Sequence, residues 1–173
     1  MAIQNIDDLE NIFNSVAERA IKKVGEKALS LLREYISIET YGTPHSTLNP
    51  EYANGTGTPT YQFLSAFILD QVQRKGNEVT QTLFYDNSNM ISTPPSKGHW
   101  GIHSDIHGNS SIDDLPSYLN TNGFPGISPI ERKPFWDDFL NSFDSQYMQW
   151  FIDAFKENGI DISGNGINVS YRI

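Results

Sequence analysis

The chain has no cysteine, no long hydrophobic run and few basic residues. Without cysteine it has no disulfide framework, no thiolate nucleophile and no thiolate metal site. No apolar run approaches the roughly 20 residues that span a bilayer, and no basic segment precedes an apolar one near Met1. We therefore expect neither membrane anchoring nor secretion.

Positive charge is also scarce. The chain has 12 Lys and Arg but 21 Asp and Glu, which gives a formal net charge of −9. Affinity for nucleic acid comes largely from clustered cations that displace counterions from phosphates. We expect DNA to pass near this protein without specific binding. A solvated acidic surface that maintains solubility is the simplest explanation of the balance.

The length of 173 residues suffices for one substantial core and is too short for several, so we expect a single domain over 1–173. Turn-forming residues predict mostly long loops over 37–59 and 86–134. The remaining segment, 160–173, is expected to be a C-terminal extension that ends in a strand, because apolar and polar residues alternate there.

Apolar residues spaced by three or four predict an amphipathic helix over 6–36. They are Leu9, Phe13, Val16, Ala20, Val24, Ala28, Leu31 and Tyr35. Such a helix would extend roughly 46 Å at about 1.5 Å per residue, longer than a domain of this size, so part of it should lean on something else. Gly25 in its interior marks either a close crossing or a bend.

A second long helix, over 136–157, carries a stripe of aromatic residues that we expect to be chiefly core. Pro134 suits its first turn, and Asn158 with Gly159 should end it. A shorter helix is expected to begin at Ser111 and end at Gly123.

Alternating residues predict a β-hairpin with strands over 67–73 and 78–85 and a turn at residues 75–77. One short turn of helix, over 60–66, should precede it. The predicted fold class is therefore α+β, with the long N-terminal helix and the aromatic C-terminal helix packed on a small antiparallel sheet, and with long loops.

Three histidines, His99, His103 and His107, stand four residues apart with Asp105 among them. On a helix this spacing would place three imidazoles on one face, where they could hold zinc. Several glycines in the same stretch argue against a helix, and no Glu stands inside a histidine pair. We therefore expect a polar loop with no metal and no cofactor, and a small metal-dependent enzyme using these histidines is an alternative.

Other catalytic patterns find little support. The Gly- and Thr-rich run 55–58 is followed by Pro59 rather than by the Lys of a phosphate-binding loop. The paired carboxylates at 113–114 and 137–138 stand in first turns of expected helices, where the helix dipole favours acids. No serine lies in a GxSxG elbow. We expect the chain not to be an enzyme.

Three short segments, in this order, resemble motifs of the tailed-bacteriophage neck and tail-completion family, whose members are also called head–tail joining or minor capsid proteins. The matching residues are Thr60, Leu64 and Ser65 before the hairpin, Tyr118 to Gly123 at the end of the short helix, and Arg132, Pro134 and Phe135 before the last helix. The similarity spans about residues 5–160. The loop 86–111 is longer than the family pattern, and Asn122 stands where an acidic residue is usual.

The resemblance implies a structural subunit of the virion, assembled in the host cytoplasm. It implies a ring, commonly sixfold, between the portal complex of the head and the tail tube, with other connector and tail proteins as partners. DNA would pass through the ring, and no active site is implied.

Long loops with embedded apolar residues fit an assembly that orders them. Candidate partner contacts are Trp100, Phe124 and Ile127. Candidate channel-lining residues are Asp105, Asp113 and Asp114, since few cations accompany them. A further alternative is a non-phage adaptor domain that binds a peptide by strand addition.

Overall fold

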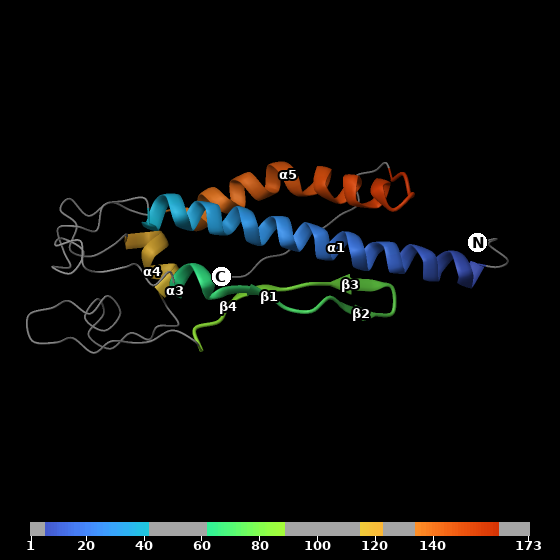
Figure 1. Ribbon diagram of the computed structural model, residues 1–173, viewed down its shortest axis with the longest axis horizontal. Helices are drawn as coiled ribbons and strands as arrows, with labels where there is room; N and C mark the ends of the chain where they lie inside the picture. Colours follow the sequence, from blue (N-terminus) through green and yellow to red (C-terminus); the bar gives the residue numbers. More distant parts are fainter. Residues whose placement is uncertain (1–5, 42–61, 89–114, 123–133, 163–173) are drawn as a thin grey trace, which may run out of the picture. The chain divides into compact units, whose positions relative to one another are not determined.

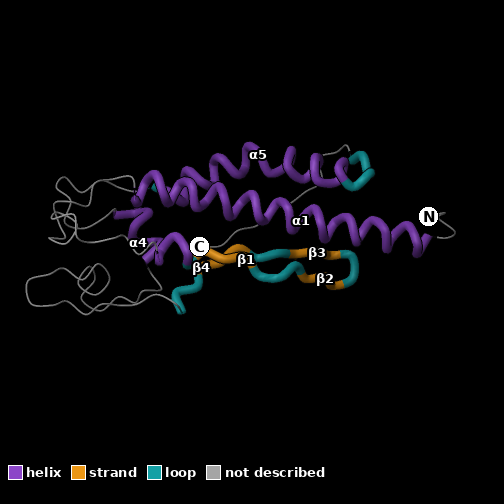
Figure 2. The backbone as a smooth tube through the Cα atoms, in the orientation of Figure 1, coloured by secondary structure: helices purple, strands orange, loops and turns teal. Residues whose placement is uncertain are grey.

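A computed structural model describes residues 6–41, 62–88, 115–122 and 134–162 of the chain (Figure 1). The helical elements are α1 (Ile6–Ile36), a π-helical turn η1 (Ser37–Tyr41), α3 (Gln62–Ser65), α4 (Leu115–Asn122) and α5 (Phe135–Glu157). The strands are β1 (Phe67–Leu69), β2 (Gln73–Lys75), β3 (Glu78–Thr80) and β4 (Leu83–Tyr85). The fold is α+β, as the sequence predicts (Figure 2).

The described residues group into two compact units. Unit 1 holds residues 6–30, 68–84 and 142–162, and unit 2 holds residues 31–41, 62–67, 85–88, 115–122 and 134–141. The expectation of a single domain over 1–173 stays a prediction.

Helix α1 occupies the predicted range, with Asp7 and Asp8 in its first turn, where acids offset the helix dipole. The expectation that a loop begins at Ser37 is wrong, because helical backbone continues through Tyr41 as a π-helical turn. The physical reason lies in the residues, since neither glycine nor proline occurs between Ile36 and Gly42.

Gly25 marks a close crossing of α1 and the hairpin, which decides between the two readings of this glycine. A Cβ built at Gly25 would collide with the carboxamide of Gln81 and lie 3.4 Å from Cδ2 of Leu69. The Gln81 side chain is held in place there, because its Nε2 donates a 3.0 Å hydrogen bond to the carbonyl of Asp70. Only a residue without a side chain leaves room for this contact.

The hairpin forms, but each of the two predicted strands is divided. Strands β2 and β3 pair antiparallel, with Arg74 opposite Val79 and Lys75 opposite Glu78, and β1 pairs with β4. Lys75 therefore belongs to a strand rather than to the turn. The turn itself needs Gly76, whose φ is +63°.

Asp70 accounts for the division of the first strand. Its carboxylate accepts hydrogen bonds from the backbone N–H of Gln71 at 2.7 Å and from Nε2 of Gln73 at 3.1 Å. Such local bonds compete with the regular ladder. One ladder-like bond persists, from the N–H of Asp70 to the carbonyl of Thr82 at 2.9 Å.

Helix α5 begins and ends where the sequence predicts. It starts directly after Pro134, whose carbonyl accepts a bond from the N–H of Asp138 at 2.9 Å. At the other end Gly159 adopts a φ of +81°, and its N–H bonds to the carbonyl of Lys156 at 2.9 Å. This arrangement is a left-handed glycine cap.

The shorter helix is confirmed as α4 in its C-terminal part. Ser111 and Gly123, the expected cap and terminator, lie outside the described residues, as does the predicted strand within 160–173.

Each unit has its own group of buried side chains. In unit 1 the cluster comprises Val16, Ala17, Ala20, Ala154 and Phe155, with Val79, Phe151, Ile160 and Ile162 packed against it. In unit 2 the buried apolar residues are Leu32, Ile36, Phe63, Ala66, Phe67, Phe135, Trp136 and Phe139. Within unit 1, α1 lies between α5 and the hairpin (Figure 1). Much of the aromatic stripe of α5 is core, as expected.

Candidate interaction site

Most of the residues singled out from the sequence lie outside the described part of the chain. These are His99, His103 and His107, Asp105, Asp113 and Asp114, and Trp100, Phe124 and Ile127. Their proposed roles stay predictions. Among the described residues, no group of three or more His, Asp or Glu side chains could hold a metal ion. Within the same residues, no helix combines the length and the apolar character needed to cross a membrane.

Described residues in or beside the three segments that carry the family resemblance meet in unit 2, whereas Thr60, Gly123 and Arg132 lie outside the described residues. Phe63, from the segment before the hairpin, packs edge-on against Phe135, from the segment before α5, with ring centroids 5.6 Å apart. Phe67 also contacts Phe135, at 6.3 Å. Asn120, from the end of α4, binds the first turn of α5. Segments about 15 to 70 residues apart thus form one packed cluster.

Asn120 caps α5 from another helix. Its Oδ1 accepts hydrogen bonds from the backbone N–H groups of Trp136, at 3.1 Å, and Asp137, at 3.4 Å. Its Nδ2 donates to Oδ1 of Asp137 at 3.1 Å. The first N–H groups of a helix have no partner within it, so this side chain satisfies them. Asp137 lies in the first turn of α5, as the sequence predicts, and its carboxylate binds the side chain of the capping Asn120.

The first two turns of α1 expose a row of large apolar side chains. Ile6 is 78% exposed, Leu9 50% and Phe13 46%. Leu9 and Phe13 belong to the apolar spacing that predicts this helix. They continue the stripe that is buried from Val16 onward, but α5 ends at Glu157 and leaves this part of α1 uncovered among the described residues. Phe13 meets Phe155 at a centroid distance of 5.4 Å.

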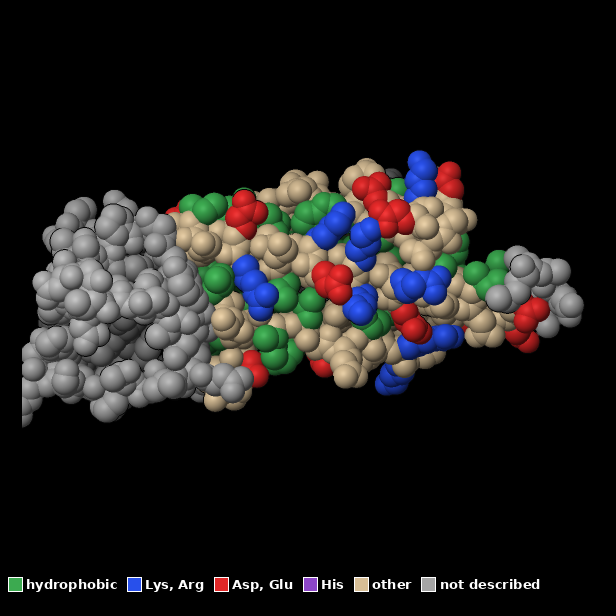
Figure 3. Space-filling view, in the orientation of Figure 1, with side chains coloured by type: hydrophobic (Ala, Val, Ile, Leu, Met, Phe, Trp, Pro, Cys, Tyr) green, Lys and Arg blue, Asp and Glu red, His purple; other side chains and the backbone are tan. Residues whose placement is uncertain are grey.

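Carboxylates surround this row. Asp7, Asp8 and Glu10 lie on the same two turns, and no Lys or Arg occurs between Ile6 and Glu18. We call Ile6, Asp7, Asp8, Leu9, Glu10 and Phe13 the acidic tip. In Figure 3 acidic and hydrophobic side chains appear together at this end of α1.

Basic side chains gather elsewhere in unit 1, over the middle of α1 and over the hairpin (Figure 3). Lys22 on α1 and Lys75 on β2 are exposed, and Arg74 on β2 lies 3.9 Å from Glu18. Carboxylates accompany these cations, because Glu18 and Glu26 lie one turn from Lys22 on α1 and Glu78 faces Lys75 across the β2–β3 pair. We call this surface the mixed-charge patch.

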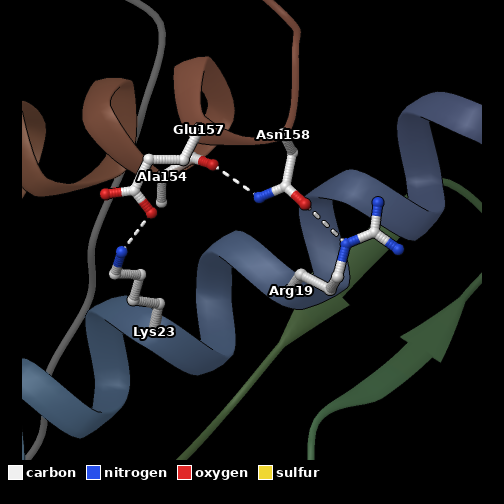
Figure 4. A network of polar contacts seen from close by, with 5 residues as sticks. All are labelled: Arg19, Lys23, Ala154, Glu157 and Asn158. Carbon is white, nitrogen blue, oxygen red and sulfur yellow. Dashed lines mark hydrogen bonds and ion pairs between the residues drawn. The ribbon is translucent and has the colours of Figure 1, made fainter.

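A polar network attaches α1 to the end of α5 (Figure 4). Arg19 Nε donates to Oδ1 of Asn158 at 2.7 Å, and Nδ2 of Asn158 donates to the carbonyl of Ala154 at 2.7 Å. Lys23 forms an ion pair with Glu157. Both partners of that pair are substantially exposed, so its contribution to stability is small.

Asp86, directly after β4, has an altered acidity with a local cause. Hydrogen bonds from the backbone and side chain of Ser88 lower the pKa of its carboxyl group below the ordinary value. The backbone bond measures 2.9 Å. An exposed carboxylate held by its own turn indicates a structural feature rather than a catalytic one.

Sequence reasoning missed both the Asn120 cap and the acidic tip. A cap supplied from 16 residues away leaves no local pattern. Two features of the sequence could have indicated the acidic tip: the length of the predicted helix and the absence of Lys and Arg between Ile6 and Glu18. Comparison with protein-family models, curated proteins and solved structures finds no match to this chain.

Proposed function

We propose that this chain is a structural protein of the tailed-bacteriophage neck, which forms a ring with copies of itself between head connector and tail and lets DNA pass. The observation that carries the proposal is the meeting of the three resemblance segments in unit 2. Phe63 directly precedes the matching residue Leu64, Phe135 is itself a matching residue, and Asn120 lies within Tyr118 to Gly123. Residues from or beside all three segments therefore pack in one unit, which supports the proposal.

The surface of α1 also supports a role in assembly. Three large apolar side chains in a row, at least 46% exposed each, are unusual on a solitary protein and typical of an interface. A 31-residue helix whose apolar stripe extends past the end of α5 fits a subunit that contacts other chains.

In this proposal the chain is part of the virion and is assembled in the host cytoplasm. Other connector and tail proteins are its further partners. The loops over 37–59 and 86–134 would contact neighbours, and Trp100, Phe124 and Ile127 are the first residues to test there.

Deletion of the coding gene from a phage genome that carries it tests the proposal directly. We expect lysates with filled heads and separate tails in electron micrographs, and restored particles when the wild-type chain is supplied in trans. A density map of restored particles should show the subunit in a ring at the neck. Infective, joined particles that lack the chain would contradict the proposal.

Elemental analysis separates the neck protein from the metal-dependent enzyme. We expect no stoichiometric zinc in the purified chain or in washed particles, and no effect of His103→Ala on particle assembly. Stoichiometric zinc that the His103→Ala variant loses would favour the enzyme instead.

A further inference from the structure

We propose that residues 167–173 add as a third strand to an outer edge of the hairpin formed by β1 to β4. That edge is then a binding site for an extended segment with apolar residues at every second position, and its occupant is the C-terminal segment of the same chain. The inference goes beyond the proposed function and does not depend on it. Residues 167–173 lie outside the described part of the chain, and the support comes from the described residues of unit 1.

The hairpin has open edges. Among the described residues, β1 pairs with β4 and β2 pairs with β3, and no other strand joins either pair. The outer N–H and C=O groups of such strands are a template for pairing with a further strand. A hairpin of two strands is also only marginally stable by itself. A third strand would therefore satisfy an edge and stabilise the hairpin.

The chain arrives beside the hairpin directly before this segment. Ile160 and Ile162, which follow α5, pack against the core cluster of unit 1, and Val79 of β3 packs against the same cluster. Four residues, Ser163 to Gly166, then separate Ile162 from the segment, and two of them are glycines, which suit a turn. Fully extended, these residues span roughly 13 Å, which exceeds the roughly 10 Å of two strand spacings. The segment can therefore reach an edge of the hairpin.

The segment alternates in the same way as the hairpin. From Glu78 to Phe84, exposed positions alternate with half-buried ones, which are Val79, Gln81 and Leu83. The half-buried side faces α1, because the Gln81 carboxamide fills the space beside Gly25. The segment also has seven residues, and its apolar positions, Ile167, Val169, Tyr171 and Ile173, alternate with polar ones. As a third strand it would extend the surface that faces α1 and place its polar side chains in solvent.

The occupant is the chain's own segment because the segment is tethered beside its site. A short flexible link holds a ligand near its site at an effective concentration on the order of millimolar. A strand of another chain at lower concentration competes poorly with it. An occupied edge also no longer pairs with other chains, which prevents uncontrolled association.

A matched pair of variants of the full chain tests the site. Val169→Asp places a carboxylate on the apolar side of the segment, and Ser170→Asp places the same charge on its polar side. Thermal unfolding confirms that both variants are folded. A labelled peptide of residues 163–173 is the probe, and fluorescence anisotropy measures its binding. We expect the Val169→Asp chain to bind the peptide at least about tenfold more tightly than the wild type or the Ser170→Asp chain, because their edges are vacant in only a small fraction of molecules.

Cross-linking tests the same contact without any change to the apolar residues. The chain has no cysteine, so Thr80→Cys and Ser170→Cys together introduce its only two thiols. Thr80 is exposed near the middle of the stretch from Glu78 to Phe84, and Ser170 is the middle residue of the segment. A short bismaleimide should join the two thiols within one chain, so that the product keeps the mass of a monomer. Each single-cysteine variant is a control, because it can form cross-links only between chains.

Three outcomes would overturn the inference. They are equal affinity of the peptide for the wild-type and Val169→Asp chains, no binding to a folded Val169→Asp chain, and cross-linked products of dimer mass only. The last outcome would place the segment on a second copy instead. All three leave the proposed function standing, since the gene deletion tests it separately.

Discussion

The side chain of Asn120 lies 3.1 Å from the backbone nitrogen of Trp136, so α4 supplies the cap with which α5 begins. Few N-caps come from so far along the chain, since the capping residue normally directly precedes its helix. Here that place is taken by Pro134, which has neither a side-chain acceptor nor an N–H.

Replacement of this cap should destabilise the protein measurably. We expect Asn120→Ala to lower the free energy of unfolding by about 1–2 kcal/mol, because the first N–H groups of α5 lose their acceptor. Thr121→Ala, on the exposed side of the same helix, is the control and should change it by less than about 0.5 kcal/mol. Equal effects of the two changes in urea unfolding would mean that the cap contributes nothing.

Gly25 and Gln81 should be energetically coupled. Alanine at position 25 favours the helix by about 1 kcal/mol but collides with the Gln81 carboxamide. We expect Gly25→Ala to be at least about 1 kcal/mol more favourable in a Gln81→Ala background than in the wild type. A double-mutant cycle of unfolding free energies measures this difference, and additive effects would show that the crossing is not close in solution.

The burial of each aromatic side chain on α5 determines how far its replacement by alanine lowers the free energy of unfolding. Phe135 is fully buried, so Phe135→Ala should cost about 3–5 kcal/mol. Trp150 is only partly buried, with Lys27 Nζ 5.5 Å from its ring, and Trp150→Ala should cost clearly less. Chemical denaturation measures the free energy of unfolding of both variants. A larger decrease for Trp150→Ala than for Phe135→Ala would contradict this assignment of the core.

The proposed DNA channel makes a prediction for residues outside the described part. If Asp113 and Asp114 line the lumen, their joint replacement by Lys should slow or trap passing DNA, since cationic walls hold phosphates. Replacement of both by Asn is the control and should leave ejection near normal. Normal ejection and infectivity of the Lys variant, with the subunit present in the particle, would exclude this lining.

Much of the fold was predictable because its signals are local. The spacing of apolar residues predicted α1, and Pro134 with Gly159 predicted the ends of α5. The division of the hairpin was not predictable from alternation, because it depends on where the Asp70 carboxylate finds donors. The exposure of Leu9 depends on where α5 ends beside α1. The spacing of apolar residues in α1 carries no information on that position.

The candidate site was less predictable than the fold. The mixed-charge patch joins Lys22 of α1 to Arg74 of β2, more than 50 residues further along the chain, and only the packing of β2 beside Glu18 brings Arg74 next to α1. Neither segment has a motif of its own. Charge and exposure become informative only once the helix and the hairpin are placed together.

The position of Asn158 before Gly159 bears on how the protein ages chemically. In an Asn–Gly pair the backbone nitrogen of the glycine can attack the side-chain amide carbon and release ammonia, and water then opens the ring to leave an acid. Asparagine is for this reason a thermolabile residue. In the folded chain both ends of the Asn158 amide are engaged, by Arg19 and by the carbonyl of Ala154, which holds the amide away from that reaction. Deamidation at this position, read by peptide mapping, would therefore record how often the end of α5 opens during storage.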